Sequence, residues 1–187
     1  SRTNFYHPAN SYLNRLLEDR EGIPITISVL YIELARRIGL ELSGVALPGH
    51  FVVGWQKTEG ELELIDAFDG GRRLKREDAE QLAGQKLQDE HFVPSEKRQI
   101  LLRMLRNLVG IAEHERDPVA LLRYLDGMLA IDCTLVRERG LRAVTLAQTG
   151  NLRAALVDLD FILEQSPDGI DVETLRRMRD RFAKQAK

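Results

Sequence analysis

One stretch, residues 22–39, constrains the fold of this chain more than any other: it reads GIPITISVLYIELARRIG. Pro24 suits the first turn of a helix, where a backbone N–H has no acceptor within the helix. Arg36 and Arg37 followed by Gly39 are typical of a helix end, because cations offset the negative end of the helix dipole. Apolar residues fall on nearly every side of this helix, which predicts a buried helix at the centre of a globular core.

The composition narrows the class of protein. A chain of 187 residues that is 43% hydrophobic and 30% charged fits one large or two small domains. The formal net charge of -2 predicts no general attraction to nucleic acid or to anionic membranes, and no segment is apolar and long enough to span a bilayer. A single cysteine, Cys133, indicates a reducing compartment, and we expect the cytoplasm. Because the chain begins with Ser1 rather than Met, we expect an N-terminal segment to be missing.

The central helix is followed by a region with the two-residue period of β-strands. His50 and Asp66 lie on two strands that the sequence predicts to form a hairpin. A loop closed at residues 57–60 would place Asp66 opposite Phe51, or opposite His50 if one strand contains a one-residue bulge. The expected elements before residue 95 are a loop over 1–11, a helix near 12–17, strands over 40–47, 50–55 and 61–68, a solvated basic loop at 72–76 and a helix near 76–82.

From Lys97 onward the apolar spacing is helical, and the region contains an internal repeat. A shift of 34 residues aligns the following pairs: Leu121 with Ala155, Leu122 with Leu156, Leu125 with Leu159, Met128 with Ile162, and Cys133 with Pro167. This is the period of the tetratricopeptide repeat (TPR), a pair of antiparallel helices. The second copy has Gly150 at the turn between its helices, whereas the first copy has Arg116 at the matching position. The sequence therefore predicts an α+β domain over residues 1–95 and a TPR-like region with a final capping helix over residues 96–187.

Residues 10–72 resemble the transglutaminase-like (papain-related) core, in the helix at 22–39, in Gly49-His50-Phe51 and in Leu64-Ile65-Asp66. In that family a cysteine at the start of the central helix attacks a carbonyl, a histidine acts as the base, and an aspartate orients the imidazole. The resemblance implies that His50 and Asp66 occupy the base and orienting positions. The nucleophile position falls on Pro24, which has no nucleophilic atom, so the implied catalytic triad is degenerate.

The combination of motifs along the chain resembles one bacterial family, the SirB-type transglutaminase-like proteins with a C-terminal TPR region. The motifs are Asn10-Ser11-Tyr12-Leu13-Asn14, Gly22-Ile23-Pro24-Ile25-Thr26, Pro48-Gly49-His50-Phe51, Ile65-Asp66-Ala67-Phe68-Asp69-Gly70-Gly71 and Arg103-Met104-Leu105-Arg106-Asn107-Leu108. The resemblance implies a cytoplasmic protein without an established reaction. It also implies that proline at the helix start is a family feature.

Two functions from different classes are compatible with these residues. The first is a non-catalytic interaction protein with a degenerate cleft at His50 and Asp66, in which the inner TPR helices, around residues 101–113 and 135–148, bind a protein or peptide partner. The second is a hydrolase or acyl-transfer enzyme that uses the His50–Asp66 dyad with water or with Ser28 as the nucleophile. The first is favoured because the position of the catalytic cysteine lacks a thiol.

Neither hypothesis includes a metal or a cofactor. The four histidines, His7, His50, His91 and His114, lack the spacing of a zinc or other metal site. A hydroxyl inside a helix, such as that of Ser28 or Thr26, more often bonds to a carbonyl one turn earlier than it acts as a nucleophile.

Overall fold

A computed structural model describes residues 7–57, 60, 62–165, 169 and 171–186. The chain divides into two compact units, Ser1–Met104 and Leu105–Lys187, so that helix α4 (Lys97–Glu115) begins in the first and ends in the second. The sequence-based boundary at residue 95 stays a prediction. Contacts on the N-terminal side of α4 show why the division falls later, because Ile100 and Met104 pack with the core of the first unit.

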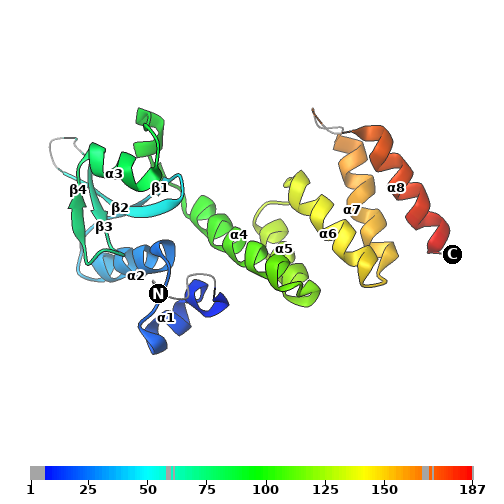
Figure 1. Cartoon of the computed structure of the whole chain (residues 1–187), viewed down its shortest axis with the longest axis horizontal. Coiled ribbons are helices and arrows are strands. Elements are labelled where there is room, and N and C mark those ends of the chain that lie inside the picture. Colours follow the sequence, from blue (N-terminus) through cyan, green and yellow to red (C-terminus); the bar gives the residue numbers. More distant parts are fainter. Residues whose placement is uncertain (1–6, 58–59, 61, 166–168, 170, 187) are drawn as a thin grey trace. The chain divides into compact units, whose positions relative to one another are not determined.

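A five-stranded antiparallel sheet is the centre of the first unit (Figure 1). Its strands lie in the order β4-β3-β2-β1-β5. Their bounds are Ser43–Leu47 for β1, His50–Gln56 for β2, Leu62–Asp66 for β3, Arg72–Leu74 for β4 and Pro94–Ser95 for β5. The helical elements of this unit are a 3-10 helix at Pro8–Ser11, α1 at Leu13–Asp19, α2 at Pro24–Arg37, α3 at Arg76–Ala83 and a second 3-10 helix at Asp89–Phe92.

Each face of the sheet is covered by a different helix (Figure 1). On one face Phe51 packs with Ile23 and Ile25 from the start of α2. On the other face Ala79 of α3 packs on a cluster of side chains from four elements and the loop after α3: Val45, Leu47, Val52, Leu64, Leu74 and Leu87. The mixed helix and antiparallel-sheet fold that the sequence predicted is confirmed.

Helix α2 begins at Pro24, as expected, but it is not buried on every side. Its first turn is buried, whereas Leu34 is 53% exposed and Ile38, which follows the helix, is 76% exposed. The physical reason is that α2 packs on β1 and β2 along one face, which leaves Leu34 and Ile38 exposed to solvent. The expectation of burial all round is therefore wrong for the second half of the helix.

Three further expectations are corrected by the structure. Residues 8–11, predicted as loop, form a 3-10 helix, because Pro8 at its first position matches the fixed φ of proline. Residues 72–74, predicted as part of a solvated basic loop, form the edge strand β4. There Leu74 enters the core, and Arg73 forms an ion pair with Glu63 at 2.7 Å. A strand was not predicted because Arg72 and Arg73 are both polar, so this segment lacks the alternation of polar and apolar residues that indicates a strand.

The third correction is the register of the hairpin. Ile65 pairs with Val53 and Leu62 with Gln56, so the connection comprises residues 57–61 and Asp66 lies level with Val52, not with Phe51 or His50. The predicted loop was one residue too short. Val52 lies two residues after His50 on β2, and side chains two residues apart on a strand share a face of the sheet. The side chains of His50 and Asp66 therefore lie on the same face. His50 and Asp66 are therefore diagonal neighbours.

The second unit is a series of antiparallel helices, and their bounds bear out the predicted repeat. Helix α5 spans Pro118–Ile131 and α7 spans Leu152–Gln165, which are helices of equal length that begin 34 residues apart. The aligned core positions are buried in both copies: Leu121 with Ala155, Leu125 with Leu159, and Met128 with Ile162. Helix α6 spans Val136–Gln148 and α8 spans Val172–Gln185. The predicted repeat end at Pro167 lies outside the described residues.

The turns of the two repeats have the same backbone conformation although their residues differ. Gly150 has φ +87°, and Arg116, the matching residue, has φ +56°. We expect Gly150→Val to lower the free energy of unfolding of this unit by about 1–2 kcal/mol, since a left-handed backbone is costly for a branched residue. No atom lies within 4 Å of a Cβ added at Gly150, so the cost comes from the backbone alone. We expect Arg116→Gly to leave the unfolding free energy unchanged or raise it by up to about 1 kcal/mol. Urea titrations of the two variants measure both effects, and equal losses would contradict the aligned turns.

Candidate functional site

The first candidate site is the pair formed by His50 and Asp66. His50 begins β2 directly after the Pro48–Gly49 turn, and Asp66 ends β3. His50 Nε2 lies 3.0 Å from Asp66 Oδ2, and no described hydrogen bond uses His50 Nδ1. The Asp66 side chain is 2% exposed and that of His50 is 12% exposed. The structure therefore brings the two predicted residues together and leaves one ring nitrogen available.

Asp66 is held firmly by its surroundings. Its Oδ1 accepts the backbone N–H of Phe68 at 3.0 Å and that of Asp69 at 3.2 Å. Burial alone would raise the pKa of Asp66, but the hydrogen bond and charge of His50 and the two N–H donors lower this pKa overall. Asp66 is thus an ionised acceptor that fixes both the imidazole and the turn after β3.

Pro24 and Ser28, the other two predicted positions, are buried in α2. Pro24 is the first residue of the helix, and its neighbours Ile23 and Ile25 are 4% and 2% exposed. Ser28 is fully buried, and its hydroxyl donates to the carbonyl of Phe51 at 3.4 Å. Ser28 thus contacts β2 at Phe51, and Ile23 and Ile25, the residues on either side of Pro24, pack with Phe51. A buried, hydrogen-bonded Ser28 has the environment of a structural hydroxyl rather than of a nucleophile.

Arg103 is a residue of this region that the sequence analysis quoted only within a motif. Its Nη2 donates to the carbonyl of Leu47 at 3.0 Å and to that of His50 at 2.7 Å. These two carbonyls flank the Pro48–Gly49 turn, so Arg103 holds both ends of the turn. The guanidinium carbon lies 5.5 Å from the centre of the Phe51 ring, and burial lowers the pKa of Arg103. Arg103 therefore positions the backbone of His50. Only the folded structure shows this role, since the two residues are far apart in sequence.

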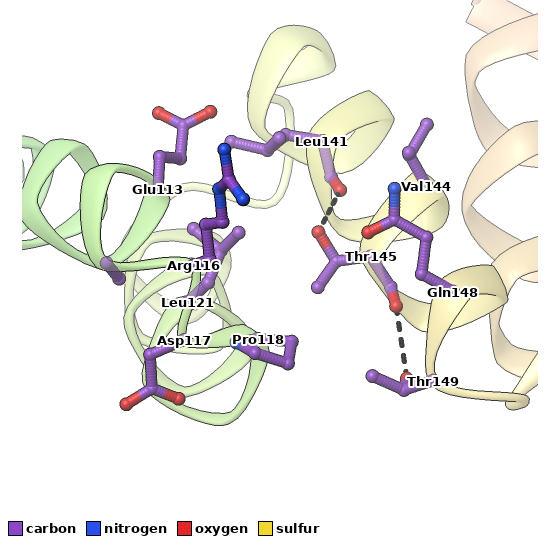
Figure 2. Close-up of a pocket in the computed structure, with 11 residues that line it drawn as sticks. Glu113, Arg116, Asp117, Pro118, Leu121, Leu141, Val144, Thr145, Gln148 and Thr149 are labelled. Carbon is purple, nitrogen blue, oxygen red and sulfur yellow. Dashed lines mark hydrogen bonds between the residues drawn. The ribbon is translucent and has the colours of Figure 1, made fainter.

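The second candidate site is a groove between α4 and α6 in the second unit (Figure 2), which we call the α4–α6 groove. Its larger part has a volume of about 450 Å³ and a smaller part about 240 Å³; Glu113 and Leu141 line both. The end of α4 and the following turn contribute Ala112, Glu113, Arg116 and Asp117 to the larger part. The start of α5 contributes Pro118 and Leu121, and α6 with the residue after it contributes Leu141, Val144, Thr145, Gln148 and Thr149. The predicted inner helices of the repeat thus face a common groove.

The wall formed by α6 is apolar in its middle and polar at its end. Leu141 and Val144 are half-buried, whereas Gln148 and Thr149 are exposed. Thr145 is buried and donates its hydroxyl to the carbonyl of Leu141 at 2.8 Å, so it presents no free donor to the groove. Figure 2 shows the side chains of Val144 and Gln148 on this wall. Such a surface fits an aliphatic segment with polar flanks.

Among the described residues, no group of three or more histidine, cysteine, aspartate or glutamate side chains could hold a metal ion. Within the same residues, no helix is both long and apolar enough to cross a membrane.

Comparison with known proteins decides the family. Residues 1–106 match the Transglutaminase-like superfamily, and residues 108–180 match a Tetratricopeptide repeat family. The chain belongs to the transglutaminase-like superfamily. Together with the relatives named below, this match confirms the resemblance to SirB-type transglutaminase-like proteins with a TPR region.

Relatives of this superfamily member occur in bacteria and in animals. A UPF0162 protein of Xylella fastidiosa (strain Temecula1) is 35% identical over 184 residues, which cover 92% of this chain and 64% of that protein. Protein SirB1 of Salmonella typhimurium is 25% identical over 173 residues, covering 88% of this chain and 63% of SirB1. F-box only protein 21 of Homo sapiens is 34% identical over 122 residues, covering 62% of this chain and 19% of that protein. The chain thus spans less than two thirds of these relatives. No solved structure matches it.

Proposed function

We propose that this protein is a non-catalytic interaction protein, in which the TPR-like unit binds a segment of a partner protein in the α4–α6 groove. The transglutaminase-like unit is a degenerate form of an enzyme fold, with Pro24 at the nucleophile position. The proposal that the protein is non-catalytic rests on the residues at the start of α2. Pro24 lacks a nucleophilic atom, and Ile23, Ile25 and Ser28 around it are buried. As part of the proposal we place the protein in the cytoplasm, because its one cysteine, Cys133, is free.

The match to a Tetratricopeptide repeat family supports the binding role, because such repeats bind peptides along the surface formed by their inner helices. In this chain α4 and α6 are those helices, and they line both parts of the groove. The apolar middle of the wall, formed by Leu141 and Val144, supplies the area for hydrophobic contact.

A second candidate function is hydrolysis or acyl transfer by the His50–Asp66 dyad with water or Ser28 as the nucleophile. The bond of 3.0 Å between His50 Nε2 and Asp66 Oδ2 favours it, since an oriented imidazole with a free ring nitrogen can act as a general base. Ser28 is buried and hydrogen-bonded to the carbonyl of Phe51, so it is poorly placed to act as the nucleophile. In this second function the nucleophile would therefore be water. We rank this function second.

The binding proposal is tested by introducing a charge into the groove. A library of random dodecapeptides displayed on phage is selected on the immobilised full chain. Peptides enriched on the wild type are expected to lose at least about tenfold in affinity for Val144→Glu, because a carboxylate on the apolar wall must be desolvated on binding. Val157→Glu is the matched control, since Val157 lies in α7 and is 65% exposed. A library that yields no binder, or binders that Val144→Glu leaves unaffected, would contradict binding in the groove.

A further inference from the structure

Helix α2 carries a line of apolar side chains on its solvent side. Tyr31, Leu34 and Ile38 are all exposed, and they belong to the first unit. Their spacing of three and four residues places them on one face of the helix, and we call them the α2 stripe. An amphipathic helix normally turns its polar face to solvent, so an apolar ridge on that side indicates a surface that another element covers.

The start of the same line is covered by the segment that precedes α2. Ile27 lies one turn before Tyr31 and is half-buried. A Cβ added at Gly22 would lie 2.9 Å from Leu16 Cδ1 and 3.1 Å from Ile27 Cγ1, so Leu16 of α1 and Ile27 meet at Gly22. The α2 stripe is therefore the uncovered continuation of a line whose first part packs with α1.

The N-terminal 3-10 helix is also attached to the start of α2. The carbonyl of Asn10 accepts the hydroxyl of Thr26 at 2.8 Å and the N–H of Ile23 at 3.4 Å. Leu34 follows Thr26 in the same helix and lies about 12 Å further along its axis. About four extended residues cover that distance. Chain that precedes residue 1 is therefore within reach of the α2 stripe.

Helix α8, by contrast, offers no comparable surface among its described residues. Its apolar side chains Leu175, Met178 and Phe182 pack with α6 and α7. Its exposed side chains are all charged or polar: Glu173, Thr174, Arg176, Arg177, Asp180, Arg181, Lys184 and Gln185. More than a third of the UPF0162 protein of Xylella fastidiosa (strain Temecula1) lies outside its match to this chain. If this protein has such additional chain, α2 rather than α8 provides an apolar surface for it.

We propose that, in the full gene product, a segment that precedes residue 1 packs on the α2 stripe as an amphipathic helix. Aliphatic side chains at intervals of three and four residues interdigitate with Tyr31, Leu34 and Ile38. The segment completes the packing of α2 between the sheet and a further helix. This inference does not depend on the α4–α6 groove, whose residues all lie in the second unit.

The experiment compares residues 1–187 with the same chain extended to the upstream start codon. Both proteins carry Leu34→Cys and Cys133→Ser, any cysteine in the extension is replaced by serine, and reaction with a maleimide dye is followed at several protein concentrations. We expect the extended chain to react at least about tenfold more slowly, because a covered thiol is inaccessible to the dye. Val157→Cys, at an exposed position of α7, is the matched control and should react equally fast in both.

A second variant tests the energy of the contact. Leu34→Glu should lower the unfolding midpoint of the extended chain and leave that of residues 1–187 unchanged, because only the extended chain would bury the carboxylate. Equal labelling rates in the two proteins, or an equal response to Leu34→Glu, would overturn the inference. So would labelling of residues 1–187 that slows as its concentration rises, since a second copy would then cover the stripe. A gene without codons upstream of residue 1 would also overturn it.

Discussion

Replacing Asp158 by alanine is expected to lower the free energy of unfolding of the helical unit by about 3–5 kcal/mol, because two arginines would lose their buried counter-charge. Asp158 of α7 is fully buried and accepts hydrogen bonds from Arg139 Nη1 at 2.8 Å and from Arg142 Nε and Nη2 at 2.8 and 2.7 Å. Arg142 also contacts Asp126 of α5 at 2.7 Å. The bonds to Asp158, followed by those to Asp126, raise the pKa of Arg142, so its charge persists throughout the accessible pH range.

The matched control is Asp160→Ala, two residues along the same helix. Asp160 forms an ion pair with Arg179 at 2.9 Å, but both side chains are at least 40% exposed. Exposed pairs contribute about 1 kcal/mol or less, so this change should have a small effect. Urea denaturation followed by circular dichroism measures both variants. Similar losses for Asp158→Ala and Asp160→Ala would show that the buried network does not connect α5, α6 and α7 as described.

The second large effect is expected at Asp66. Asp66→Ala should lower the unfolding free energy of the first unit by about 2–4 kcal/mol, because it removes a buried carboxylate that three hydrogen-bonding groups share as their acceptor. These are the imidazole of His50 and the N–H groups of Phe68 and Asp69. Asp69→Ala is the control, since the Asp69 side chain is 44% exposed and its ion pair with Arg72 is on the surface.

The contribution of Asp66 should also depend on pH with a defined sign. Its pKa is lower in the folded state than the ordinary value, so the unfolded state takes up the proton first as the pH falls. The difference in stability between the wild type and Asp66→Ala should therefore be full above a pH of about 4, and it should shrink progressively below that pH. Denaturant titrations between pH 7 and pH 3 measure it. A difference that grows on acidification would contradict the ionised, hydrogen-bonded Asp66.

The parts of the fold that repeat were the easiest to predict from the sequence. The shift of 34 residues aligned α5 with α7, because the same buried positions recur in each repeat and no long-range information is needed. The hairpin register was harder, because it depends on the length of the connection at residues 57–61, which no turn motif fixes. His50 and Asp66 nevertheless meet, since an offset of two residues keeps both side chains on one face.

The residues missed by the sequence analysis are those whose roles depend on distant partners. Asp158 lies on the buried stripe of α7 with Ala155, Leu159 and Ile162, so an acid at an apolar position was a signal that could have been noticed. Its two arginine partners, by contrast, are identified only once α6 is placed beside α7. The position of Arg116 was noted as a departure from glycine, but its place in the lining of the groove is seen only once α6 is placed opposite the turn after α4.

The most direct test of the account is a search for catalysis by the intact chain. The wild type and His50→Ala are incubated with 4-nitrophenyl acetate and with a fluorogenic peptide amide, and the release of product is compared with buffer alone. With Pro24 at the nucleophile position and Ser28 buried, we predict that neither protein releases product faster than buffer. Saturable turnover by the wild type that disappears in a folded His50→Ala would contradict the account and establish the dyad as an active site.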